Sequence, residues 1–462
     1  MDLIFRLRQV LQVLRFKPFD TSSEVGRSKE RYRLIALSST SSLAVKFITS
    51  LIGLVSVPLT IHYLGKEQFG LWMVVSSLVV WLQLADFGIV NGLTNALAEA
   101  HGRDDTEAAN GYISTAFTAS SLVAIFCLPV LALLALWLPW GGILNLNDAT
   151  LIQLASRCFL VAGVVFVVSL PFSVISRVYT AYQLGYITNV AQVFSSLCSL
   201  AGLLISISLK LNMQWLVLLV SLGPVLGNLV SLLVVKKYLP WFRIKGLLVS
   251  RIALQRVAHS SIPLFVFQIG ALLVNQMVNV VIAQVGTLSM VADYNILLKI
   301  YMLIFAMGVS FSAPFYPAIR EAYERREKDW VMSSIYRVVT IRLGVLVVPT
   351  IILLFIGDWL IKLWIHQPMG EKFGIFGWLA FMASLLLVAT SSTLSEILTS
   401  LDDIWSQIKV VFVSAFIVLS GMYFLIPKIG LSAVFISMAV STVYPISWLF
   451  LKLNRKIVRD LA

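Results

Sequence analysis

Lys46 is a charged residue inside a long apolar stretch, and its chemistry needs an explanation. Residues 34–61 are mostly apolar or small. At about 1.5 Å per residue, they are long enough to cross a hydrocarbon core of about 30 Å. An ammonium group near the bilayer centre costs at least ~2.5 kcal/mol, and a helix facing lipid has no compensation for it. We therefore expect Lys46 to face water or an anion inside the protein.

Small and polar residues share the helix face of Lys46. They recur at steps of three and four and are Ser39, Ser42, Thr49, Ser50, Gly53, Ser56 and Thr60. Close packing of two helices is the ordinary explanation of such a stripe. The lysine among them favours a polar cavity instead.

Further polar residues lie inside other apolar stretches. Gln268, Asn275 and Asn279 follow one another at steps of seven and four. Such amides either bond neighbouring helices or line a cleft that binds a ligand. The predicted substrate-binding residues are Lys46, Lys299, Gln268, Asn275, Asn279 and Arg157, and the predicted coupling or gating residues are Asp86, Glu396 and Arg177. Arg157, Arg342 and Glu396 are close enough to predicted span ends for their side chains to reach the membrane surface, which is the alternative explanation for them.

Composition places the chain among polytopic membrane proteins. Of its 462 residues, 59% are hydrophobic and 12% are charged, about half the ~25% charge of a soluble domain. The net charge of +13 is attributed to cytoplasmic loops rather than to a nucleic-acid partner. Three cysteines in separate apolar runs and four scattered histidines predict no disulfide framework and no metal site.

The length of the chain and its apolar runs predict an all-α protein with about twelve spans. The expected spans are residues 34–61, 68–97, 111–138, 151–178, 185–209, 213–235, 260–284, 289–316, 335–356, 373–398, 405–426 and 431–451. Most Lys and Arg residues fall in alternate loops, which predicts that both termini are cytoplasmic. The expected parts are a basic amphipathic arm and linker (1–33), two six-helix bundles (34–237 and 259–452), a basic linker between them (238–258) and a tail (453–462).

Short sequence matches across the linker indicate an internal duplication. Residues 96–101 reappear as residues 318–323, and Trp137-Leu138 reappears as Trp359-Leu360, each 222 residues later. Two copies of six spans have the same orientation in the membrane, which predicts a pseudo-twofold axis along the membrane normal.

Several enzyme classes lack their motifs. The sequence contains no GxxxxGK[ST] or GxGxxG motif, so nothing indicates ATP hydrolysis or dinucleotide binding. No outer loop is rich in the carboxylates that a membrane glycosyltransferase or ligase needs. A scaffold without transport activity would leave the lysines within spans unexplained. A transporter without a bound cofactor is the remaining prediction.

Three stretches resemble a known family. Residues 58–72 (PLTIHYLGKEQFGLW), 84–92 (LADFGIVNG) and 96–105 are similar to the N-terminal half of bacterial polysaccharide transporters. These are the O-antigen-type flippases of lipid-linked oligosaccharides, in the superfamily that includes multidrug and toxin extrusion (MATE) exporters. The resemblance is clearest over residues 34–120. It implies two six-helix bundles, alternating access and a cationic central cavity.

The resemblance also implies a cargo. We expect a polyprenyl-pyrophosphate oligosaccharide to cross from the cytoplasmic to the outer leaflet of a bacterial inner membrane, for O-antigen, capsule or exopolysaccharide synthesis. Membrane lipids, a polysaccharide polymerase and a ligase are the expected partners, and H⁺ or Na⁺ is the expected coupling ion. The alternative is a cation-coupled, MATE-like exporter of small amphipathic molecules.

Overall fold

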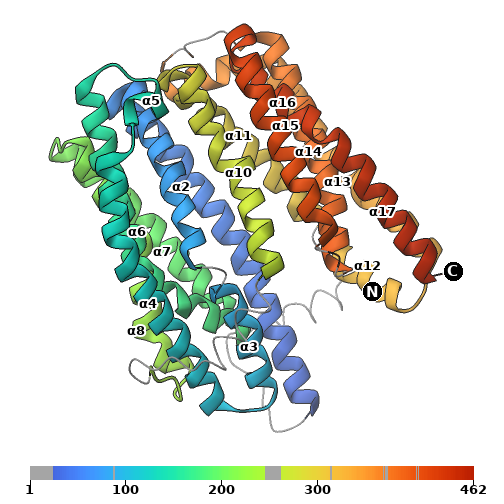
Figure 1. Ribbon diagram of the computed structural model, residues 1–462. Helices are drawn as coiled ribbons and strands as arrows, with labels where there is room; N and C mark the ends of the chain where they lie inside the picture. Colours follow the sequence, from blue (N-terminus) through green and yellow to red (C-terminus); the bar gives the residue numbers. More distant parts are fainter. Residues whose placement is uncertain are drawn as a thin grey trace. The chain divides into compact units, whose positions relative to one another are not determined.

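The computed structural model describes residues 24–461, except 87–88, 245–261, 313–314, 368, 370–372, 402 and 404. The described residues are almost entirely helical and contain no strand (Figure 1). Eleven of their helices are long and apolar enough to cross a membrane. The prediction of an all-α polytopic membrane protein is therefore confirmed. The predicted amphipathic arm and most of the basic linker lie outside the described residues.

The first predicted span and the first part of the second, residues 68–80, both lie in one long helix, α2 (Glu24–Val80). Its 57 residues would extend for about 85 Å, far more than one membrane crossing requires. The helical geometry breaks at Gly65, where φ is 77° and ψ is 164°, a conformation that favours glycine. This break accounts for eleven candidate helices where about twelve spans were predicted.

Two boundary predictions were wrong. Residues 24–33, predicted as a linker, are the first turns of α2. The predicted span 68–97 is not one continuous helix, because a 3₁₀ helix, η1 (Trp81–Asp86), separates α2 from α3 (Ile89–Gly102). A 3₁₀ stretch between two α-helices is a frequent place for a hinge.

The described chain forms two compact units. The first contains residues up to 53, 85–134 and 160–262, and the second contains residues 54–84, 135–159 and 263–461. Three helices continue from one unit into the other, so that each unit contains one end of each of them. They are α2, α4 (Thr106–Trp137) and α6 (Ala149–Ala181). The division into bundles at 34–237 and 259–452 stays a prediction.

The first unit contains α3, α7 (Gly185–Ser208) and α8 (Met213–Tyr238), with parts of α2, α4 and α6. Its core is formed by side chains of α3, α4, α6 and α8, among them Leu97, Ile113 and Val178. The hydroxyl of the buried Tyr179 donates to the Ser231 carbonyl at 2.7 Å, which joins α6 to α8.

The second unit contains the remaining helices. They are α5 (Trp140–Leu144), α10 (Ile262–Val285), α11 (Leu288–Ser312), α12 (Phe315–Glu324), α13 (Lys328–Ile365), α14 (Gly374–Ser400), α15 (Trp405–Ile429), α16 (Ser432–Ser441) and α17 (Val443–Leu461). Helix α16 packs against both α14 and α15 (Figure 1). The predicted last span, 431–451, is divided at Thr442 into α16 and an amphipathic α17.

A close approach within the second unit requires glycine at position 70. A Cβ atom placed there would lie 1.9 Å from the Leu288 carbonyl oxygen. We expect Gly70→Ala to lower the thermal unfolding temperature in detergent, because overpacking of this kind typically costs ~1–3 kcal/mol. Gly111→Ala is the control, since a Cβ atom on that helical glycine would meet nothing within 4 Å. Equal stability of the two variants would contradict the packing of α2 against the start of α11.

Candidate functional site

Lys46 lies on α2, within the first unit. Its side chain is exposed and makes no hydrogen bond or ion pair with any described residue. The Thr49 hydroxyl one turn later donates to the Val45 carbonyl at 2.8 Å, so it is satisfied by its own helix. No described carboxylate neutralises the Lys46 ammonium.

Lys299 lies on α11, within the second unit, and it too is exposed. Its ammonium makes no ion pair with a residue that the structure describes. Asn295, one turn earlier, is buried and donates to the Val291 carbonyl at 2.8 Å and to Asn279 Oδ1 at 2.9 Å. The helix face next to Lys299 is therefore already hydrogen-bonded within the protein, while the lysine is not.

The three predicted amides of α10 have different surroundings. Asn279 is buried; it donates to the Ser77 hydroxyl at 2.6 Å and accepts from Asn295. Asn279 therefore bonds neighbouring helices, which is one of the two roles that the sequence allows for these amides. Asn275 is exposed and lines a cavity, and Gln268 is half-buried. Of the three, Asn275 is the amide that the structure brings to a cavity.

This cavity lies within the second unit, among α10, α11, α14, α15, α16 and α17. Its volume is about 330 Å³, at the lower end of the range for small-molecule sites. Its walls are mainly apolar and aromatic, and its polar groups are Asn275, Ser391, Ser392, Ser395, Gln407, Ser414, Ser441 and Thr442. An apolar chamber with a few hydroxyl and amide groups suits an amphipathic ligand.

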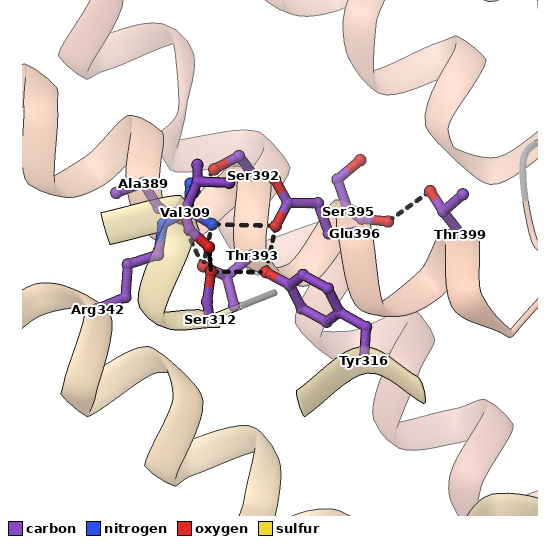
Figure 2. Close-up of polar contacts among 10 residues, drawn as sticks. All are labelled: Val309, Ser312, Tyr316, Arg342, Ala389, Ser392, Thr393, Ser395, Glu396 and Thr399. Atoms are coloured by element: carbon purple, nitrogen blue, oxygen red, sulfur yellow. Dashed lines mark hydrogen bonds and ion pairs between the residues drawn. The ribbon is translucent and has the colours of Figure 1, made fainter. Parts of the chain in front are cut away.

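An ion pair lies beside the cavity, at the junction of α12, α13 and α14 (Figure 2). Arg342 Nη1 is 3.1 Å from Glu396 Oε2 and donates to the Thr393 hydroxyl at 3.0 Å. The Tyr316 hydroxyl donates to the same carboxylate oxygen. Glu396 is thus held by an arginine and a tyrosine from two other helices.

Arg342 does not reach the membrane surface, so that alternative explanation of it was wrong. The residue is 1% exposed, and its guanidinium carbon lies 4.9 Å from the centre of the Phe305 ring. Its Nε and Nη2 atoms are buried without a hydrogen-bond partner among the described residues. Because burial of an arginine is costly unless it is paired, Arg342 depends on Glu396.

The cavity and the ion pair are linked through α14. Ser392 and Ser395, which line the cavity, are close in sequence to Glu396, and Figure 2 shows all three on one stretch of this helix. The Ser395 hydroxyl donates to Gln407 Oε1, and Gln407 Nε2 donates to the Thr399 hydroxyl at 2.9 Å. A change in the charge of Glu396 would therefore act next to a ligand chamber.

The remaining predicted residues are not brought to this place. Arg157 is exposed on α6 in the second unit, and Arg177 is half-buried on α6 in the first unit. Asp86 ends η1, but its side chain lies outside the described residues. Their roles in binding or coupling stay predictions.

Sequence reasoning missed one buried ion pair, Lys66 with Asp293. The two atoms Nζ and Oδ1 are 2.5 Å apart, and the side chains are 14% and 2% exposed. The predicted spans place Lys66 in a loop and Asp293 near the start of another span, and 227 residues separate them. No local pattern indicates such a pairing.

Comparisons with known proteins agree on the family and on the fold. A family model described as "Polysaccharide biosynthesis protein" matches residues 36–322. The chain is 23% identical over 427 residues to the "Putative O-antigen transporter" of Salmonella typhimurium (strain LT2), with 88% of this chain and 93% of that protein covered.

Two solved structures share the fold. An inward-facing multidrug resistance MATE family transporter has a TM-score of 0.73 at 14% identity and covers 89% of this chain and 95% of its own. The lipid II flippase MurJ, in its inward closed conformation, has a TM-score of 0.71 at 11% identity and covers 91% and 90%.

The buried pair Lys66–Asp293 gives a stability prediction. We expect Lys66→Ala to destabilise the protein by ~3–5 kcal/mol, because a buried carboxylate loses its cation. A double-mutant cycle with Asp293→Ala, followed by thermal unfolding in detergent, measures the coupling between the two side chains. Arg103→Ala is the control, because its pair with Glu99 is exposed, at 67% and 38%, and such pairs contribute at most ~1 kcal/mol. An equal loss of stability in the two variants would contradict a stabilising contribution from the Lys66–Asp293 pair.

Proposed function

The chain belongs to the polysaccharide biosynthesis protein family, and on that premise we propose that it flips a lipid-linked oligosaccharide across the membrane. It is a multi-pass membrane protein and a transporter rather than an enzyme. The proposed cargo is a polyprenyl-pyrophosphate oligosaccharide, moved from the cytoplasmic to the outer leaflet of the bacterial inner membrane. Both termini are proposed to be cytoplasmic, and the sugar units serve O-antigen, capsule or exopolysaccharide synthesis.

One observation carries the proposal beyond family membership. Lys46 and Lys299 are exposed on apolar helices, and neither has an acidic partner among the described residues. A charge in this position needs water or an anion. A pyrophosphate supplies such an anion, and its own passage through a low-dielectric region is costly without nearby cations.

The remaining parts of the cargo have different requirements. The hydroxyl groups of the sugar need hydrogen-bond partners, and Gln268 and Asn275 are the two predicted substrate-binding amides of α10 that are not buried. The polyprenyl tail is apolar and can stay in the bilayer during transport. We propose that an alternating-access cycle carries only the head group past the lysines. A polymerase and a ligase are proposed to use the product.

A second candidate function is favoured by the cavity of the second unit. A largely apolar chamber of about 330 Å³ is large enough for a small amphipathic molecule. It is too small for a whole oligosaccharide. A MATE-like exporter of such molecules would use this chamber as its binding site, and Lys46 and Lys299 would then be dispensable.

Coupling of transport to H⁺ or Na⁺ is proposed to involve Glu396. Its carboxylate is shared by Arg342 and Tyr316, so binding of a proton would weaken the attraction to Arg342 and leave the buried guanidinium less stable. That difference would favour another packing of α12, α13 and α14. Asp86 is the alternative coupling residue, proposed from its position within a predicted span.

The lysines give the main functional prediction. We expect Lys46→Ala and Lys299→Ala each to lower the rate of flipping at least about tenfold, since loss of one cation near a pyrophosphate costs more than ~1.4 kcal/mol in a low-dielectric site. The measurement is the leaflet on which lipid-linked oligosaccharide accumulates in cells that carry only the variant. Lys46→Arg and Lys299→Arg, which keep the charge, should retain flipping.

Lys428→Ala is the matched control, because Lys428 lies in the last turn of α15 and should leave flipping unchanged. Protein levels must be equal in all strains. Full flipping by both alanine variants would rule out a mechanism in which Lys46 and Lys299 neutralise the pyrophosphate. Resistance to cationic dyes in a strain with excess protein, together with unchanged leaflet distribution in a deletion strain, would favour the small-molecule exporter.

The coupling proposal has its own test. In proteoliposomes, Glu396→Gln should make the transport rate independent of an imposed pH or Na⁺ gradient, because the amide cannot gain or lose charge. Asp86→Asn is measured in parallel to decide between the two carboxylates. A gradient response of Glu396→Gln equal to that of the unchanged protein would exclude Glu396 from coupling.

A further inference from the structure

Helix α17 carries two different stripes of side chains. Leu449, Leu453 and Ile457, at steps of four, are buried in a core cluster with residues of α12, α13 and α14. Trp448, Lys452, Arg455 and Arg459 follow one another at steps of four, three and four, which places them along another face of the same helix. The first stripe holds the helix in place, and the second carries three of the basic side chains of this helix.

A hollow of about 690 Å³ lies along this second stripe. Its charged lining residues are Lys452, Arg455, Lys456, Arg459 and Asp403. The Lys456 ammonium donates to the Leu401 carbonyl at 2.6 Å, and the Asp403 carboxylate accepts from the Ser406 amide at 3.2 Å. Four cations against one acid give the hollow a positive potential, which suits an anion.

Aromatic and apolar residues at the start of the hollow are exposed. The rings of Tyr444 and Trp448 stack with centroids 6.1 Å apart, and these residues are 39% and 38% exposed. Leu451 is 51% exposed. Exposed aromatic and apolar side chains followed by lysine and arginine form the order that a helix shows where it leaves the hydrocarbon and enters the headgroup region.

We propose that the hollow binds the phosphate headgroup of an anionic phospholipid, with the acyl chains lying against Tyr444, Trp448 and Leu451. A soluble anion would satisfy the cations, but it would leave those apolar side chains uncovered. A lipid covers both. None of these residues is among those proposed to hold the transported cargo, so the site is additional to the proposed function.

Native mass spectrometry of the purified full-length protein tests the site. Phosphatidylglycerol and phosphatidylcholine with identical acyl chains are added in equal amounts, and the fraction of protein that retains each lipid is measured. We expect preferential retention of phosphatidylglycerol. Lys452→Ala/Arg455→Ala should weaken that retention roughly thirtyfold, because each cation near an anionic headgroup contributes about 1 kcal/mol.

Arg325→Ala/Arg326→Ala is the matched control, since it removes the same charge from exposed positions after α12 and should leave retention unchanged. Asp403→Asn, which removes the acid from the hollow, should strengthen phosphatidylglycerol retention and does not depend on the folding of the double variant. Equal retention of the two lipids overturns the proposal. Displacement of phosphatidylglycerol by millimolar inorganic phosphate would also overturn it, because the hollow would then be a site for free anions.

Discussion

A charged side chain within a membrane-spanning helix must find an opposite charge, water or a ligand, and this constraint separates the charges of the protein into two groups. Arg342 and Lys66 are paired with Glu396 and Asp293 at 3.1 and 2.5 Å. Lys46 and Lys299 have no such partner among the described residues. The paired cations have a use within the fold, because removal of either would leave a carboxylate poorly compensated. Lys46 and Lys299 instead require water or a ligand.

Uncharged polar side chains within the membrane-spanning helices also need partners, but leaving them unpaired costs less free energy than leaving a charge unpaired. Many serine and threonine hydroxyls donate to carbonyls one turn earlier, as Thr60 does to Ser56 at 2.7 Å and Ser77 to Met73 at 2.9 Å. Such bonds allow polar residues within spans without a partner on another helix. Their oxygen lone pairs stay available as acceptors, as Ser77 shows by accepting from Asn279. Polar stripes on these helices therefore serve packing and ligand contact together.

Interruptions of the helices occur beside the polar features. The break at Gly65 directly precedes Lys66, whose ammonium bonds Asp293 on α11. The division between α16 and α17 lies at Thr442, which lines the cavity of the second unit. A transporter must change conformation, and such non-helical points absorb backbone rotation more easily than continuous helix. The end of α16 lines the cavity, and the Arg342–Glu396 pair lies beside it, so all three belong to one part of the second unit.

The sequence by itself determined the class of protein, most of the spans and the family, because length, hydropathy and short motifs are local properties. It also identified Lys46 and Lys299 as charges within apolar runs, since such a charge is visible without a structure. Only the tertiary structure decided which charges are paired. Arg342 looked like a residue that reaches the membrane surface, yet it is buried against Glu396, 54 residues away. No pattern in the sequence pairs Lys66 with Asp293. Asn275 and Asn279 lie on one helix face by spacing, but one lines a cavity and the other bonds Ser77. The physical reason is that a partner depends on which helices pack together, and that is decided by the whole core rather than by any local pattern.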